Sequence, residues 1–177
     1  MGNHGDKIDR EEAVGRFQHE RAVVLYVEPG SGELEQDGAC PLQQKLVRVT
    51  VAQHRRKHLE AAPQTVAAFR TMLPLESKII HVRWSGEGGW IPMGDLDLGI
   101  APENATRYPN PGEIIFYPGG ISETELLLAY GYVSFASKAG PLAGNHFATI
   151  VEGDENLRTL GRRFLWEGAQ EIVFAER

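Results

Sequence analysis

Four side chains have the chemistry to transfer protons or to stabilise developing charge, namely His81, Arg83, Glu103 and His146. Histidine changes its charge near neutral pH, and a glutamate can serve as its acid–base partner, with or without a bound metal. An arginine can favour a twisted amide through hydrogen bonds and so promote proline isomerisation. Two enzyme classes therefore stay open as alternatives: an acid–base catalyst using His81, His146 and Glu103, and a proline isomerase using Arg83.

Side chains suited to holding a small molecule are more numerous than these catalytic candidates. Metabolite pockets commonly have aromatic walls and a few polar groups that orient the ligand. Residues 85–111 are rich in Gly, Pro, Asp and Asn, and so long an irregular segment in a small domain is usually functional. We expect this segment and the loops near Ser122 and Asn145 to form a pocket for a small polar or anionic metabolite. The predicted ligand-binding residues are Trp84, Trp90, Asn104, Tyr108, Tyr117, Glu123, Tyr130, Lys138 and Asn145.

Several of these residues also have a purely structural interpretation. Aromatic side chains on strands usually belong to the core, which applies to Trp90, Tyr117 and Tyr130. Asn104 follows Pro-Glu and Asn145 follows Gly, and asparagine at such places often bonds to nearby backbone in a turn. Both interpretations remain open from the residues alone.

Motifs that would define a metal or cofactor site are absent from the sequence. There is no H-E-x-x-H, no pair of cysteines, and no G-x-S-x-G. The glycine cluster at 86–89 lacks the Lys-Ser/Thr of a phosphate loop, so we predict a hairpin turn there. We accordingly predict neither a metal nor a cofactor.

The elements that must position these residues are mostly short strands. Alternating or continuous apolar runs predict strands at 22–27, 46–51, 78–84, 113–117, 124–130, 132–136, 147–151 and 172–174. Pro63 suits a first helical position, and apolar residues then recur at helical spacing until Pro74. A second helix opens after Gly153 and ends near Gly168. This arrangement is typical of an antiparallel barrel or sandwich with two helices packed outside it.

Three segments resemble cyclophilins in the right order. A-P-Q-T-V-A-A-F at 62–69 resembles the start of the first cyclophilin helix, and I-V-E-G at 150–153 the entry to the second. G-E-I-I-F-Y-P-G-G at 112–120 is similar to a segment of bacterial cyclophilin-like proteins of unassigned function. The resemblance implies a mainly β, closed eight-stranded antiparallel barrel with two flanking α-helices.

The chain is most similar to an uncharacterised bacterial branch of that group, a domain-of-unknown-function family. The segments that carry this likeness are 84–87, 118–125 and 143–147. The F-H-R-x-I string of cyclophilin isomerases is missing, and His81-Val82-Arg83 is its nearest counterpart. The resemblance therefore implies a fold without bringing a known reaction, because one fold can serve many chemistries.

Composition sets the outer limits of these predictions. The 177 residues, 42% hydrophobic, suffice for one core, so we expect a single domain at 21–177 behind a flexible leader at 1–20. A net charge of −6 argues against nucleic-acid binding. A single cysteine and the lack of a long apolar stretch favour a cytoplasmic protein without a membrane partner. Exposed aromatic residues would suit a homo-oligomer interface.

Overall fold

The computed structural model describes residues 23–28, 48–50 and 61–176, with side chains described from residue 61 onward. The predicted leader at 1–20 and the cysteine at position 40 lie outside these residues. The strands are β1 (Val23–Glu28), β2 (Arg48–Thr50), β3 (Leu75–His81), β4 (Gly86–Gly94), β5 (Ala105–Thr106), β6 (Glu113–Tyr117), β7 (Thr124–Val133), β8 (Ala136–Ser137), β9 (Gly140–Pro141), β10 (Gly144–Glu152) and β11 (Gln170–Glu176). The helices are α3 (Pro63–Thr71), the short 3₁₀ helix η2 (Asp154–Asn156) and α4 (Leu157–Trp166).

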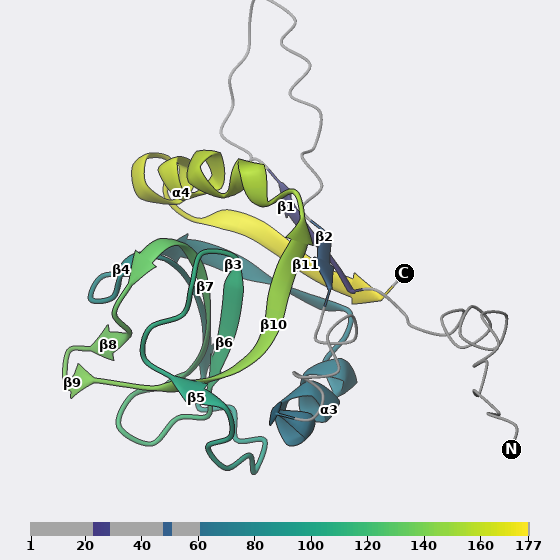
Figure 1. Cartoon of the computed structure of the whole chain (residues 1–177), viewed down its shortest axis with the longest axis vertical. Coiled ribbons are helices and arrows are strands. Elements are labelled where there is room, and N and C mark those ends of the chain that lie inside the picture. The colour runs from purple at the N-terminus through teal and green to yellow at the C-terminus, as the bar shows by residue number, and fades with distance from the viewer. Residues whose placement is uncertain (1–22, 29–47, 51–60, 177) are drawn as a thin grey trace, which may run out of the picture.

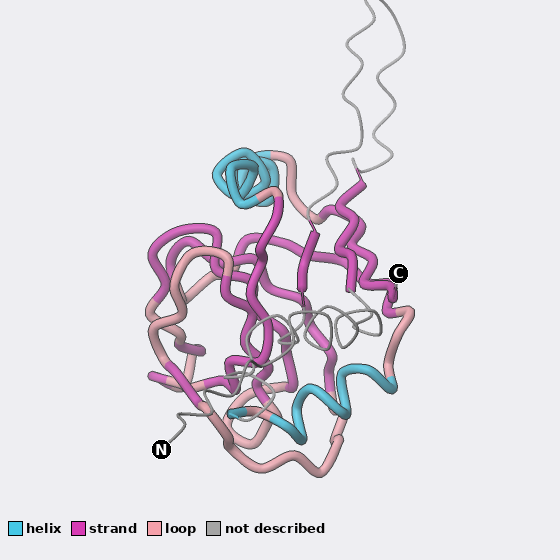
Figure 2. The backbone as a smooth tube through the Cα atoms, turned by 45° about the vertical axis from the view of Figure 1, so that its right-hand side comes forward, coloured by secondary structure: helices cyan, strands magenta, loops and turns pink. Residues whose placement is uncertain are grey.

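The strands form one curled antiparallel sheet with a separate small hairpin. Along the sheet the order is β1-β11-β3-β4-β7-β6-β10-β2, and β5 adds to β10. Strands β8 and β9 pair with each other only. Figures 1 and 2 show α4 and α3 at opposite ends of the curled sheet. The fold is therefore mainly β with two helices, as predicted.

Closure of the sheet into a barrel is not confirmed. The two end strands, β1 and β2, lie next to each other. No ladder joins them within 23–28 and 48–50, the parts of these strands that the structure describes. The coarser prediction of a curled antiparallel sheet with two helices holds, and the closed eight-stranded barrel stays a prediction.

Strand β7 is buried on both faces because it runs through the middle of the sheet. Successive side chains of a strand point to opposite faces. Leu126 and Leu128 belong to the larger apolar core, which includes residues of both helices. Leu127 and Ala129 belong to a second core on the other face, with Phe135 and Leu142 from the segment around the small hairpin. Position 125 points to the same face as Leu127 and Ala129, so the side chain there is expected to be buried as well.

Both helices lie where the sequence predicts them. Pro63 stands at the start of α3, whose Val66 and Phe69 are buried. In α4 the predicted apolar face is confirmed, since Leu157, Leu160 and Phe164 are all buried. Gly168 follows α4 with a φ of 86°, a conformation that favours glycine and ends the helix.

Three predictions of local structure were wrong. The glycine cluster at 86–89 is the start of β4 and not a hairpin turn, so the segment 85–111 begins with a strand and is not irregular throughout. A Cβ added at Gly89 would lie 2.5 Å from Cδ1 of Ile79, so glycine is needed there for β4 to pack closely. Strand β3 ends at His81, which leaves Arg83 and Trp84 in the loop before β4. The predicted strands at 124–130 and 132–136 are largely one strand, β7, which continues through Gly131.

Candidate functional site

A pocket lies on the second face of the sheet, opposite the face that meets the helices. Its volume is about 220 Å³, below the roughly 300–1,000 Å³ typical of sites for drug-sized ligands. It is bounded by the β3–β4 loop, β4, the start of β7 with the loop before it, and the β8–β9 hairpin. We call it the Glu125 pocket; its lining residues are Val82, Arg83, Trp84, Trp90, Ser122, Glu123, Glu125, Ala136, Ser137 and Lys138.

A buried carboxyl group lines this pocket. Glu125 is 6% exposed, since β7 is flanked by β4 and β6, with Pro92 and Tyr117 opposite it in the two ladders. Burial, with a smaller contribution from repulsion by Glu123, raises the pKa of Glu125 to about 7. Within the described residues Glu125 makes no ion pair, and the polar group beside its carboxylate is the indole N–H of Trp90. An uncharged or half-charged acid thus faces the pocket near neutral pH.

The indole of Trp90 supplies a second polar group to the same wall. Its Nε1–H is buried and satisfies no hydrogen bond among the residues that the structure describes. The group still lies close enough to Glu125 to oppose the rise of its pKa, so the two interact with an alignment too poor for a full hydrogen bond. Leaving a buried donor unpaired costs about 1–3 kcal/mol, and a ligand or water in the pocket would supply the missing acceptor.

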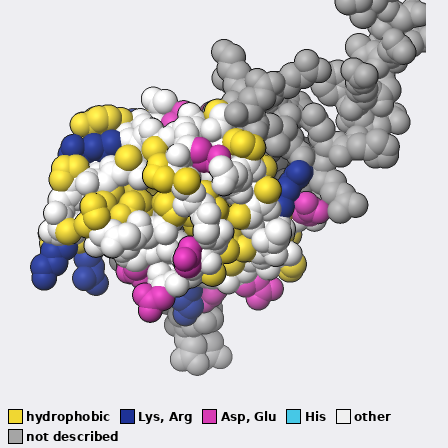
Figure 3. Space-filling model, turned by 90° about the horizontal axis from the view of Figure 1, so that it is seen from below, with side chains coloured by type: hydrophobic (Ala, Val, Ile, Leu, Met, Phe, Trp, Pro, Cys, Tyr) yellow, Lys and Arg dark blue, Asp and Glu magenta, His cyan; other side chains and the backbone are white. Residues whose placement is uncertain are grey.

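Charged and aromatic side chains surround the opening of the pocket. Arg83, Lys138 and Glu123 are exposed, and Trp84 is 57% exposed. Figure 3 shows Lys and Arg side chains gathered on the side of the molecule where Figure 1 places β8 and β9. With two cations and Glu123 at the opening and Glu125 deeper on the wall, the pocket can contact both signs of charge.

Backbone and hydroxyl contacts hold the loops around the pocket. Ser85 Oγ donates to the carbonyl of Ala136 at 3.0 Å and accepts from its backbone N–H at 3.1 Å, which joins the β3–β4 loop to β8. The hydroxyl of Tyr117 accepts from the Ile121 N–H at 3.1 Å, and Thr124 Oγ1 donates to the Leu96 carbonyl at 2.6 Å. These bonds position the segments that carry Arg83, Glu123 and Lys138.

Five predicted site residues therefore meet in one place. Arg83, Trp84, Trp90, Glu123 and Lys138 all line the Glu125 pocket. Tyr117 lies beside it, with its ring edge-on to Phe135 at a centroid distance of 5.7 Å. The predicted loop around Ser122 contributes as well, whereas the loop around Asn145 does not.

Two other predicted residues, Glu103 and Asn145, form a separate network with Thr65 that we call the Asn145 cluster. Oε1 of Glu103 accepts from the backbone N–H and the hydroxyl of Thr65 at 2.6 and 2.7 Å, and so caps the first turn of α3. Asn145 is 1% exposed; its Oδ1 accepts from the Glu103 N–H, and its Nδ2 donates to Thr65 and to the Ala101 carbonyl. All these bonds are internal to the protein and tie residues 101–103 to α3 and β10.

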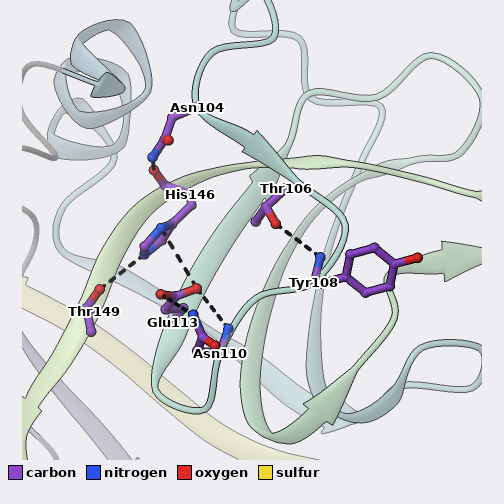
Figure 4. A network of polar contacts seen from close by, with 7 residues as sticks. All are labelled: Asn104, Thr106, Tyr108, Asn110, Glu113, His146 and Thr149. Atoms are coloured by element: carbon purple, nitrogen blue, oxygen red, sulfur yellow. Dashed lines mark hydrogen bonds and ion pairs between the residues drawn. The ribbon is translucent and has the colours of Figure 1, made fainter.

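Figure 4 shows a second polar network close to β10. Nδ2 of Asn104 donates to the His146 carbonyl at 2.7 Å, and the His146 ring lies between Glu113, at 3.9 Å, and Thr149, at 3.1 Å. His146 is 8% exposed. Tyr108 is exposed, with the Arg107 guanidinium 5.4 Å from its ring centroid. None of these residues lines the Glu125 pocket.

His81 and Tyr130 lie together on the opposite side of the sheet. The Tyr130 hydroxyl and His81 Nδ1 share a hydrogen bond of 2.7 Å in a cleft beside α4. Burial raises the pKa of Tyr130, and the nearby carboxylate of Glu87 adds to the rise. The predicted acid–base residues His81, Glu103 and His146 thus take part in three separate sets of contacts. Within residues 61–176, no three His, Asp or Glu side chains gather in a way that could hold a metal ion.

Sequence reasoning missed Glu125 itself, along with Ser137. A signal was present: Glu125 is the one charged residue in the run T-E-L-L-L-A-Y at 124–130. A charge within a continuously apolar run points to a buried ionisable group, because such runs mark strands covered on both faces.

A family model described as "Protein of unknown function (DUF3830)" matches residues 46–176. The chain belongs to the DUF3830 family. This match covers every strand and helix described above except β1, and it brings no assigned activity to the DUF3830 fold.

Among solved structures, the DUF3830 chain is similar to McbB, described as in complex with tryptophan. The TM-score is 0.59 at 17% sequence identity, which shows a likeness of fold alone. The likeness covers 88% of this chain and 44% of McbB, so the DUF3830 chain spans less than half the length of that protein. A search of curated proteins found no match. Neither the family match nor the McbB likeness shows the resemblance to cyclophilins, which stays a prediction.

Among the described residues, no helix is long and apolar enough to cross a membrane.

Proposed function

We propose that this DUF3830 protein binds a small polar metabolite in the Glu125 pocket. One observation carries the proposal: the buried carboxyl group of Glu125 and the buried indole N–H of Trp90 line the same cavity, and Nε1 of Trp90 makes no well-aligned hydrogen bond among the described residues. Buried polar groups in folded proteins nearly always have partners, so groups that lack them next to an open volume are suited to a ligand. The likeness of fold to McbB, described as in complex with tryptophan, is compatible with small-molecule binding.

A thermal-shift screen of the full chain against a metabolite panel tests this proposal. A ligand at about 100 times its dissociation constant stabilises a protein by about 2.7 kcal/mol. The shift is expected to be clearly smaller in Glu125→Gln and to persist in full in Glu76→Gln, a matched control at an exposed position of β3. A panel without any stabilising compound, or a shift that Glu125→Gln retains in full, contradicts the proposal.

A second candidate function is acid–base catalysis at the same carboxyl group. A general acid or base works best when its pKa lies near the operating pH, and the pKa of Glu125 is about 7. This candidate is the acid–base enzyme predicted from the sequence, but its catalytic group is Glu125 and not His81, His146 or Glu103. Catalysis is distinguished from binding if the wild type converts a bound compound and Glu125→Gln still binds that compound but no longer converts it. A proline isomerase using Arg83 stays a prediction, testable with a proline tetrapeptide and Arg83→Ala.

Further proposals concern the whole molecule. The sheet closes into a cyclophilin-like barrel through β1 and β2, supported by the proximity of these strands. The protein acts in the cytoplasm, supported by its single cysteine, and it forms a homo-oligomer through exposed aromatic residues such as Tyr132 and Trp166, which are 73% and 81% exposed. Light scattering of the full chain tests the last of these, since a monomer mass would contradict it.

A further inference from the structure

The Glu125 pocket contains two acidic and two basic side chains that do not pair with each other. Glu123 and Glu125 face it together with Arg83 and Lys138, and no ion pair within 4.0 Å joins any of the four among the described residues. Opposite charges that share a small space attract each other strongly when water is scarce. Here all four line one cavity without pairing, so both signs of charge are open to a partner there.

Of these four charged side chains only Glu125 is buried. Glu125 is 6% exposed on a central strand, whereas Arg83, Lys138 and Glu123 are exposed on loops at the opening, where two cations stand against one anion. A cationic group placed at Glu125 would also relieve the repulsion between Glu125 and Glu123, two residues apart on the chain. An anionic group at the same depth would add a third negative charge beside these two carboxyl groups. The inner part of the pocket therefore favours a cation, and the opening favours an anion.

We infer that the pocket takes a zwitterion, namely a free amino acid or a compound with the same pairing of an amine and a carboxylate. The amine contacts Glu125, and the carboxylate contacts Arg83 and Lys138 at the opening. The side chain of such a ligand lies against the indoles of Trp84 and Trp90, which suits an apolar or aromatic group and adds attraction for the ammonium. This inference rests on the proposed function and narrows its substrate class.

Matched compounds test the two charges separately. Binding of the standard free amino acids to the full chain is measured by calorimetry at about pH 8, and each amino acid that binds is compared with its decarboxylated amine and its deaminated acid. For phenylalanine these are phenethylamine and 3-phenylpropionate. Each single-charge compound is expected to bind about tenfold or more weakly, since a charge-assisted hydrogen bond contributes about 1.5–3 kcal/mol. An acid that binds as tightly as its amino acid overturns the inference.

Two variants assign the charges to their partners. Glu125→Gln is expected to reduce the affinity for the amino acid to that for the deaminated acid, and Lys138→Gln to reduce it towards that for the amine. Lys138 is exposed, so its variant tests the inference even if Glu125→Gln folds poorly. Arg158→Gln, at an exposed position of α4 outside the pocket, is the control and should bind like the wild type. Retention of full affinity by both pocket variants overturns the inference.

The pH dependence distinguishes this orientation from its reverse. The charged or titratable groups facing Glu125 are Glu123, Arg83, Lys138 and, across the ladder, Tyr117. An amine needs the ionised carboxylate, so the affinity for the amino acid should be about tenfold higher at pH 8 than at pH 6. If the ligand carboxylate instead faces a protonated Glu125, the affinity should rise as the pH falls, which would overturn the inference.

The outcomes also separate this inference from the proposed function. If other metabolites stabilise the protein through Glu125 while no amino acid binds, the inference of a zwitterionic ligand is wrong and the proposal of a metabolite pocket is supported. If neither the amino acids nor the wider panel binds, both are wrong.

Discussion

The Asn145 cluster and the Glu125 pocket are two buried polar regions that differ in how far their polar groups are hydrogen-bonded within the protein. In the first, Asn145 and Glu103 bond to the protein with all their hydrogen bonds directed at α3, β10 and the 101–103 segment. In the second, Glu125 and Trp90 adjoin a cavity, and the polar contact that these side chains make among the described residues is with each other. Polarity and burial alone therefore do not distinguish a structural residue from a ligand-binding one; the presence of an internal partner does.

Glu125→Gln should give the largest effect, and in the stabilising direction. The folded-state pKa of about 7 lies above the ordinary value of 4.5, so the folded protein holds its proton more tightly and loses stability as the pH rises from about 4.5 to 7. The full loss, about 3 kcal/mol, is present above pH 7. A glutamine mimics the neutral acid, so the variant should be more stable than the wild type at pH 8.

Urea denaturation at several pH values measures this effect. The difference between variant and wild type should shrink as the pH falls and vanish near pH 4.5. A difference that does not vary with pH would show that the charge of Glu125 carries no cost in the folded protein.

Asn145→Ala should give the next largest effect, with the opposite sign. The substitution leaves the Glu103 N–H and the Ala101 carbonyl without their side-chain partner, and Thr65 loses a donor. We expect a loss of about 2–3 kcal/mol in the free energy of unfolding, because buried groups are left unpaired. Urea denaturation at pH 7 measures it, and a loss below about 0.5 kcal/mol would remove the contrast between the two regions.

Glu103→Gln should cost about 1 kcal/mol by weakening the cap of α3. The amide oxygen can still accept from Thr65, but the negative charge near the helix N-terminus is lost. Ligand affinity at the Glu125 pocket should not change, because Glu103 does not line it. Denaturation and calorimetry on the same variant check both statements. A loss of affinity without a loss of stability would show that Glu103 takes part in ligand binding.

Trp90→Phe should change stability least while weakening binding. The ring keeps most of its packing, and the unpaired N–H is removed, so the free energy of unfolding should stay within about 1 kcal/mol of the wild type. A ligand that accepts a hydrogen bond from Nε1 should bind about threefold to tenfold more weakly. Unchanged affinity for every ligand of the pocket would show that the indole N–H has no role in binding.

The sequence predicts much of the fold because periodicity depends on the chain alone. The strand at 113–117 and the buried face of α4 follow directly from apolar spacing. The start of β4 could not be predicted in the same way, since glycines at 86–89 have no side chain to show a pattern. Their role becomes visible only once Ile79 is known to pack against Gly89.

The candidate site is predictable in part for a similar reason. Trp84, Trp90 and Lys138 have side chains whose type alone suggests binding, and the structure brings them to one pocket. The burial of Glu125 depends on the ladders that β4 and β6 make on its two sides, which the sequence does not reveal. From the sequence alone Asn145 is an equally plausible ligand-binding residue and Glu103 a plausible catalytic one, and only their bonds to Thr65 indicate a structural role.

The hairpin of β8 and β9 stands apart from the main sheet, joined to the β3–β4 loop through Ser85. Glu125 and Trp90 belong to central strands of that sheet, whereas Lys138 is carried at the tip of the hairpin. The inner and outer walls of the pocket are thus positioned by separate sets of contacts, and the inner wall determines which headgroup binds. Compounds that share one headgroup and differ widely in size should therefore compete for the same place.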